Sequence, residues 1–133
     1  RRSPAPGPRL AAATLLRTAL VPALAEELFW RAALLPRPGA EAPLPWLRAS
    51  ALVLLFTLYH VPAGRLLAAS GAAPGARAAF SDARFLCLAA MLGCACTAAF
   101  WYSRGSVWAA WLVHWAPVNA WLLLYGGEKQ LRG

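Results

Sequence analysis

Four long apolar stretches, separated by short polar or proline-rich segments, make up most of this 133-residue chain. They run approximately over residues 10–35, 45–69, 84–101 and 107–125. An apolar helix of about 20 residues crosses the hydrocarbon core of a bilayer, which is about 30 Å thick. With 60% hydrophobic and 14% charged residues, the chain is more apolar than soluble domains usually are. We predict an all-α, polytopic transmembrane helical bundle with four spanning helices around an intramembrane polar cavity; a soluble bundle of buried helices is the alternative.

The chain is expected to form one domain with a polar segment at each end. Residues 1–9 read RRSPAPGPR, a proline-rich and basic stretch that cannot pack into a core and predicts a disordered lead-in. Residues 10–127 contain all four apolar stretches and form the membrane domain, and residues 128–133 form a polar tail. Because the first residue is not Met, we expect the chain to be a fragment or a processed form.

Membrane topology explains the net charge of +8 better than nucleic-acid binding does. The basic residues show neither the runs nor the aromatic interleaving typical of a nucleic-acid site, so we predict no nucleic-acid partner. With four spans, those near helix ends divide into two unequal sets: Arg1, Arg2, Arg9, Arg65, Arg77, Arg84, Lys129 and Arg132 on one side, against Arg37, Arg48 and Arg104 on the other. The positive-inside tendency places the first set, and both termini, in the cytoplasm or its equivalent. Trp46, Trp101 and Trp108 all lie at the opposite interface, as an aromatic belt requires.

The first apolar stretch contains two glutamates and an arginine, in the run EELFWR at residues 26–31. Ionisable groups at membrane depth cost several kcal/mol unless they are paired or face water, so they indicate a functional site. Glu27 and Arg31 are four residues apart and share a helix face, which predicts an ion pair. Glu26 projects about 100° away and is left for a partner on another helix. Pro22 should kink or loosen the helix just before the glutamates, which would help to admit water.

The two histidines also lie inside predicted spans. His60 follows Phe56 by four residues in the second stretch, and His114 lies in the fourth. At about 1.5 Å per residue, Glu26 lies about 13 Å deep, His114 about 11 Å and His60 about 17 to 22 Å, differences that helix tilt can absorb. In one cavity, Glu26 and His60 could activate water while His114 stabilises the oxyanion. A structural role as polar contacts between helices remains open beside catalysis.

We predict no metal and no cofactor. A glutamate and two histidines could complete a three-ligand zinc site, but no HExxH spacing fixes two ligands on one helix face, and Glu27 is expected to pair with Arg31. The three cysteines all lie in the third apolar stretch, at positions 87, 94 and 96. An odd number within one helix excludes a complete disulfide framework, so we interpret them as small buried residues and assign them no metal.

Three motifs occur in a fixed order: Glu26-Glu27-x-x-x-Arg31, Phe56-x-x-x-His60 and His114. In order and type they resemble the motifs of the CAAX protease and bacteriocin-processing family, also called Abi, which includes the type II CAAX prenyl endopeptidases. The surrounding sequence is similar to the branch common in cyanobacteria, plastids and some bacteria, at FWRAALLP (29–36), DARFL (82–86) and RGSVW (104–108). The resemblance covers nearly everything after the first nine residues.

This resemblance implies an intramembrane, glutamate-dependent endopeptidase of the CAAX prenyl protease type, historically called a metalloprotease. By analogy, Glu26 and His60 position and activate the water and His114 helps to form the oxyanion site. The supporting residues are Glu27, Arg31, Phe56, which packs the cavity wall, and Asn119. The implied partners are membrane lipid and a membrane-anchored peptide or protein substrate, prenylated or not, and the implied location is a bacterial inner membrane or a plastid membrane.

One position departs from the family pattern. The prenyl endopeptidases carry an Asn four residues after the last histidine, where this chain has Val118 and places Asn119 one residue further on. One residue turns a helical side chain by about 100°, so Asn119 does not simply inherit that role. Two other classes of function stay open from the sequence. One is a non-catalytic membrane immunity or interaction protein on the same scaffold, and the other is a proton or solute pathway lined by Glu26, His60 and His114.

Overall fold

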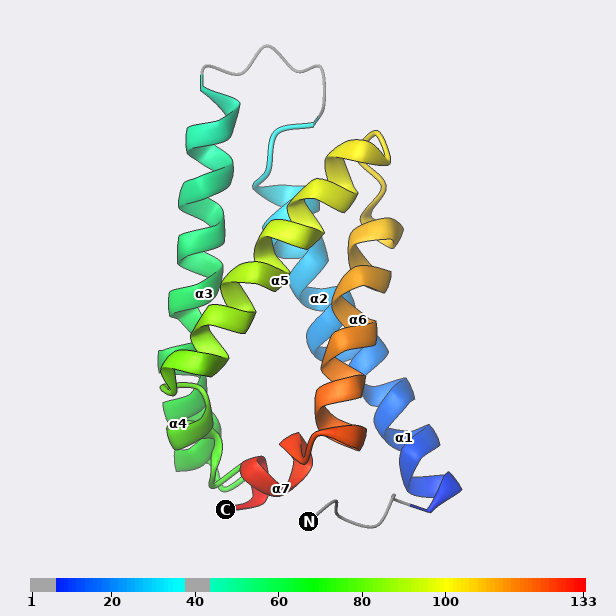
Figure 1. Ribbon diagram of the computed structural model, residues 1–133, viewed down its shortest axis with the longest axis vertical. Helices are drawn as coiled ribbons and strands as arrows, with labels where there is room; N and C mark the ends of the chain where they lie inside the picture. Colours follow the sequence, from blue (N-terminus) through cyan, green and yellow to red (C-terminus); the bar gives the residue numbers. More distant parts are fainter. Residues whose placement is uncertain (1–6, 38–43) are drawn as a thin grey trace.

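The computed structural model describes residues 7–37 and 44–133, and in these residues it contains helices and no strand (Figure 1). Three helices are long and apolar enough to cross a membrane by length and composition: α3 (Pro45–Ala69), α5 (Ala83–Tyr102) and α6 (Val107–Leu124). At about 1.5 Å per residue even the shortest of them approaches the thickness of the hydrocarbon core. The predicted all-α membrane bundle is confirmed.

The first apolar stretch is a chain of short helical segments instead of one continuous helix. It consists of α1 (Pro8–Thr18), the π-helical η1 (Ala19–Leu24), the single turn α2 (Ala25–Glu27) and the π-helical η2 (Leu28–Ala33). None of these segments has the length of a span, so in the described residues the structure establishes three spanning helices and leaves the predicted count of four open.

Pro22 explains the break in the first stretch. Val21 has φ −132° and ψ 119°, which lies outside the helical region, and the Val21–Pro22 peptide bond is cis. Proline lacks the amide hydrogen that would bond to the Thr18 carbonyl, and its ring clashes with that carbonyl in a regular helix. The predicted kink before the glutamates is therefore present.

Trp46 and Trp101 lie together at one end of the bundle. Figure 1 shows α4 (Ala76–Ala79) and α7 (Gly127–Arg132) at the end where the chain finishes, while α3 begins and α5 turns into α6 at the other end. At that other end the rings of Trp46 and Trp101 meet edge to face, with centroids 4.7 Å apart. The Trp101 indole also donates to the Pro36 carbonyl at 3.0 Å. These contacts place tryptophans together at one end, as an interfacial belt requires.

Large apolar side chains cover the outside of the bundle. Leu16, Leu66 and Leu124 are each more than 70% exposed, and Leu54, Leu88 and Trp108 are about 60% exposed. Scattered apolar residues are normal on a soluble surface, but a surface covered with them on every long helix matches contact with lipid.

Helix α6 forms several hydrogen bonds to the broken first stretch. The indoles of Trp111 and Trp115 donate to the carbonyls of Ala19 and Leu15, at 2.7 and 3.0 Å. Further along, the Thr18 hydroxyl donates to Asn119 Oδ1 at 2.9 Å. Because the break interrupts the regular helical bonding of this stretch, hydrogen bonds with α6 help to hold it in place.

Helices α3 and α5 approach each other closely at Gly93. A Cβ atom at this position would lie 3.1 Å from the Phe56 ring and 3.3 Å from Val53. Phe56 is 1% exposed, so its ring has little room to move. Gly93 thus lets the two helices pack against each other near the charged residues of the first stretch.

We expect Gly93→Val to lower the free energy of unfolding by about 1–3 kcal/mol, because overpacking a well-filled interface forces side chains out of their rotamers. Thermal unfolding in detergent, followed by circular dichroism, measures the loss. Ala51→Val, on an exposed part of α3, is the matched control. Equal stability of the two variants would contradict close packing at Gly93.

Candidate active site

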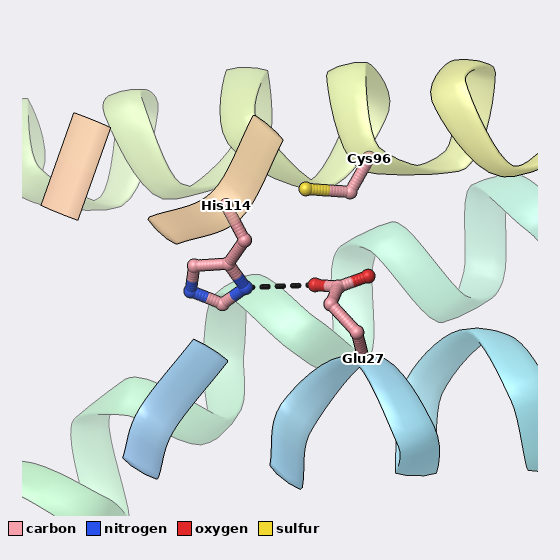
Figure 2. A group of neighbouring side chains, drawn as sticks. All are labelled: Glu27, Cys96 and His114. Atoms are coloured by element: carbon pink, nitrogen blue, oxygen red, sulfur yellow. Dashed lines mark hydrogen bonds and ion pairs between the residues drawn. The ribbon is translucent and has the colours of Figure 1, made fainter. Parts of the chain in front are cut away.

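Glu26, Glu27, Arg31 and His114 form a buried polar cluster, and the side chain of Glu27 lies at its centre. It is 0% exposed, and its Oε1 atom accepts hydrogen bonds from Arg31 Nη1 at 3.1 Å and from His114 Nδ1 at 2.7 Å. Figure 2 shows Glu27 and His114 pointing toward each other from α2 and α6. The ion pair predicted between Glu27 and Arg31 is thus present in the structure.

Arg31 connects the first stretch to two other helices. Its Nη2 donates to the Gly93 carbonyl on α5 at 3.0 Å, and its guanidinium lies 4.7 Å from the centre of the Phe56 ring on α3. Arg31 is 2% exposed. A buried charge needs a partner and satisfied hydrogen bonds, and here the carboxylate, the carbonyl and the ring face supply them.

The contact with Glu27 fixes the orientation of His114. An ionised carboxylate only accepts hydrogen bonds, so we assign the proton to Nδ1 of His114, which leaves Nε2 as the second ring nitrogen. Nε2 lies 3.7 Å from Oε2 of Glu26. The two glutamates therefore contact opposite nitrogens of one imidazole.

Glu26 is the more accessible of the two glutamates. Its side chain is 16% exposed, against 0% for Glu27. Within the described residues its Oε2 atom is buried and has no hydrogen-bond partner in the protein. Buried carboxylate oxygens are nearly always bonded, so an unpartnered one that faces an imidazole nitrogen is suited to hold a small polar group.

His60 lies beside this cluster, next to Phe56. Its Nδ1 is 2.9 Å from the Phe56 carbonyl and must donate to it, because a carbonyl oxygen only accepts. In the part of the chain that is described, His60 forms no ion pair with Glu26. The Phe56 ring lies 5.2 Å from the ring of His60 and 5.9 Å from that of His114. The structure thus joins Glu26, Glu27, Arg31 and His114 directly, and His60 through Phe56.

Asn119 lies away from the cluster. Its Oδ1 accepts from Thr18, and its Nδ2 donates to the Trp115 carbonyl at 2.8 Å. Both ends of the amide are therefore bonded where α6 meets α1. This agrees with the helix geometry, since position 119 is turned by about 100° from position 118. Its supporting role in this structure is to connect helices.

Two residues beside the glutamates were not singled out from the sequence as site residues. Figure 2 shows the Cys96 side chain on α5, beside the hydrogen bond between Glu27 and His114. The potential ligand atoms of all three residues lie within 4.8 Å of one another. The ring of Tyr59 packs against the rings of Trp30 and His60, with centroids 5.5 and 4.5 Å away. Tyr59 follows Phe56 by three residues and so shares its helix face, a signal that was available. Nothing in the sequence indicates which face of α5 meets Glu27.

The arrangement of Glu27, Cys96 and His114 does not fit a zinc ion. Ligand atoms at about 2.0 to 2.1 Å from a tetrahedral zinc lie roughly 3.3 Å apart. Glu27 Oε1 and His114 Nδ1 are only 2.7 Å apart and are bonded to each other, and Arg31 binds the same oxygen. Glu26 and His114 have a wider spacing, but they supply two ligands where catalytic zinc sites take three.

We expect Arg31→Met to lower the free energy of unfolding by about 3–5 kcal/mol, because it leaves the carboxylate of Glu27 buried without its cation. Adding Glu27→Gln should restore part of the loss, since it removes the unpaired charge. Unfolding in detergent measures both effects.

Arg132→Met is the matched control, since Arg132 and Glu128 form an ion pair of the same spacing on the surface, with the arginine 69% exposed. Its effect should be below about 1 kcal/mol. Equal losses for Arg31→Met and Arg132→Met would contradict a buried, structural role for the inner pair.

The comparisons with known proteins identify the family. The family model described as Type II CAAX prenyl endopeptidase Rce1-like matches residues 8–119, a range that contains Glu26, Glu27 and both histidines. Searches of curated proteins and of solved structures found no match. The matched range covers most of the chain and agrees with the helical membrane bundle and with the motifs found in the sequence. The chain belongs to the Rce1-like family of type II CAAX prenyl endopeptidases.

Proposed function

We propose that this chain is an intramembrane endopeptidase that hydrolyses a peptide bond with a water molecule activated by Glu26 and His114. The observation that carries the proposal is the pair of facing acceptors, Glu26 Oε2 and His114 Nε2, 3.7 Å apart in the interior of the bundle. Neither atom is occupied by another hydrogen bond among the described residues. A water molecule between them would donate one hydrogen to each and direct its lone pairs outward.

The reaction follows from this geometry. The water oxygen forms a bond to the carbonyl carbon of the substrate, and the water proton passes to the Glu26–His114 pair. The electrons of the carbonyl double bond move to its oxygen, which becomes an oxyanion. When the intermediate collapses, the C–N bond breaks and the leaving amine takes the proton back. The products are a carboxylic acid, which passes its proton to the amine or to solvent to become a carboxylate, and the amine.

Glu27 acts in this proposal by holding His114. A carboxylate on Nδ1 fixes the tautomer and the ring orientation, so that Nε2 faces the water, and it stabilises the imidazole when Nε2 gains a proton. Arg31 in turn offsets the charge of Glu27. This role is supported by Glu27 Oε1, which accepts hydrogen bonds from both Arg31 and His114.

His60 is assigned to the substrate side of the site. Its Nδ1 is bonded to the Phe56 carbonyl, so Nε2 is the nitrogen left for substrate or solvent. The ring is fixed on several sides, with Phe80 and Phe85 at 5.6 and 5.3 Å. An imidazole held in this way can position a substrate beside Glu26 without contacting Glu26 itself.

The proposed substrate is a membrane-anchored peptide or protein, prenylated in the family sense or anchored by another apolar segment. A site between apolar helices is reached most directly from the bilayer, and the lipid-facing leucines of the bundle provide that surface. The proposed location is a bacterial inner membrane or a plastid membrane.

We expect Glu26→Gln to lower kcat/KM by at least about 10²-fold, because the amide keeps the shape of the side chain and cannot accept the water proton. The assay is cleavage of quenched fluorescent peptides, S-farnesylated and unmodified, by detergent-purified protein.

Glu128→Gln, the same change in the Glu–Arg pair of α7, is the control and should leave cleavage unchanged. Full activity in Glu26→Gln would contradict the proposal. A folded wild-type protein that cleaves neither class of peptide would also contradict it and would favour a non-catalytic immunity or interaction protein.

We further propose that the water is activated without a metal, since the carboxylate and the imidazole nearest to each other are bonded directly. Cleavage should therefore survive exhaustive treatment with 1,10-phenanthroline and EDTA. Loss of cleavage, with recovery on addition of Zn²⁺, would overturn this part of the proposal and leave the roles of Glu26 and His114 to be reassigned around the ion.

A further inference from the structure

An open hollow lies between the last turns of α3 and the segment that forms α4, at the end of the bundle where the chain finishes (Figure 1). Its volume is about 690 Å³, and it is lined by two arginines and three apolar residues: Arg65, Ala68, Ala69, Pro74 and Arg77. Both arginines are exposed, and neither forms an ion pair within residues 7–37 and 44–133. The hollow therefore presents two positive charges that no described side chain balances.

The acidic side chains that the structure describes are all engaged elsewhere. Asp82 caps the start of α5, where its Oδ1 atom accepts from two backbone N–H groups at 2.8 and 3.3 Å. Glu128 forms an ion pair with Arg132 on α7. Glu26 and Glu27 belong to the buried polar cluster. An anion that balances the hollow would thus come from outside the described part of the chain.

The carbonyl groups at the end of α3 do not balance the arginines either. The last carbonyls of a helix lack partners within it and carry partial negative charge. Here backbone amides of the turn after α3 bond three of them at 2.9 to 3.2 Å, those of Leu66, Leu67 and Ala68. The two guanidinium groups are therefore the groups of the hollow suited to bind a ligand, and the ligand they suit is an anion.

Close backbone contacts fix the two segments that carry the arginines. Gly64 directly precedes Arg65, and a Cβ atom at Gly64 would lie only 2.7 Å from the Ala76 carbonyl oxygen of α4. On the other side, the amide of Gly75 donates to a carbonyl of α7 at 2.9 Å. The backbones at Arg65 and Arg77 are thus held in place before a ligand binds, which lowers the entropic cost of binding.

The position of Arg65 along α3 places the hollow at the level of lipid headgroups. Nineteen residues separate it from Trp46, which at about 1.5 Å per residue is about 28 Å along the helix. The hydrocarbon core of a bilayer is about 30 Å thick. With Trp46 and Trp101 at one interface, Arg65 lies at the other. Leu58, two helical turns before Arg65 on the same face, is 50% exposed and continues this surface toward the hydrocarbon.

We propose that Arg65 and Arg77 bind the phosphate group of an anionic phospholipid, whose acyl chains lie along the face of α3 that carries Leu58. Guanidinium groups bind phosphate oxygens in a bidentate manner and stay charged at every physiological pH. A headgroup of net negative charge fits better than a zwitterionic one, because the hollow has no described carboxylate to bind an ammonium group. Basic pockets beside membrane helices hold anionic headgroups in the same way. Neither arginine belongs to the buried polar cluster, so this site is independent of the proposed hydrolysis.

The first test is binding of phosphatidylglycerol to detergent-purified protein, measured by native mass spectrometry. We expect the double variant Arg65→Gln/Arg77→Gln to bind this lipid at least about tenfold more weakly than the wild type, because the charge-assisted contacts to phosphate are lost. Arg48→Gln/Arg104→Gln removes the same charge from exposed positions at the other end of the bundle, so it is the matched control and should keep wild-type affinity. Equal losses in the two double variants would show a general attraction between positive charge and the lipid, and would overturn the site.

Two further ligands, tested on the wild type alone, identify what the hollow recognises. Phosphatidylcholine with the same acyl chains should bind more weakly than phosphatidylglycerol, since its headgroup has no net charge. An excess of inorganic phosphate should leave phosphatidylglycerol bound, since free phosphate lacks the chains that contact α3. Equal binding of the two lipids would overturn recognition of the anionic headgroup. Complete displacement by phosphate would assign the hollow to a free anion and overturn the lipid site.

Thermal unfolding gives a second measurement of the same site. Phosphatidylglycerol should raise the Tm of the wild type, because a ligand that binds the folded state stabilises it, and should not raise the Tm of Arg65→Gln/Arg77→Gln. Without lipid the two proteins should unfold at the same temperature, since both arginines are exposed and form no ion pair with a described residue. An equal rise in Tm for both proteins would contradict binding at Arg65 and Arg77.

Discussion

The buried ion pair between Glu27 and Arg31 is the interaction on which the rest of the site depends. Both side chains are almost fully withdrawn from solvent, in the interior of a bundle whose outer surface is apolar. The cost of burying the two charges is offset only because each has further partners: His114 for the carboxylate, and the Gly93 carbonyl with the Phe56 ring for the guanidinium. These partners come from three different helices. The pair therefore specifies how α3, α5 and α6 meet the first stretch.

Much of this arrangement could be predicted from the sequence. The length of the apolar stretches predicted the long helices, and the amide hydrogen that Pro22 lacks predicted the break. The four-residue spacing predicted the contact of Glu27 with Arg31. Each of these predictions depends on residues close together in the chain. Pro22 divides the first stretch into segments shorter than a span, so the predicted count of four spans stays open. His60 is bonded to the Phe56 carbonyl through Nδ1, and its predicted role beside Glu26 stays a prediction.

The contacts between distant residues could not be predicted in the same way. Depth along the helix axis indicated that Glu26 and His114 could meet, but depth does not determine rotation about the axis. Rotation decides that His114 directs Nδ1 to Glu27 and that Asn119 faces Thr18. It also brings Cys96 beside Glu27. Helix rotation is set by packing over the whole interface, of which the close approach of α3 and α5 at Gly93 is one part.

The hydrogen bonds from α6 to the broken stretch have a consequence for how the site assembles. Trp111, His114 and Trp115 lie on adjacent positions of one helix face, and their partners are Ala19, Glu27 and Leu15. A shift of α6 by one residue would turn all three side chains by about 100° and break the three contacts together. The indoles thus set the helical register in which His114 reaches the glutamates, so the docking of the first stretch and the formation of the site are a single cooperative event.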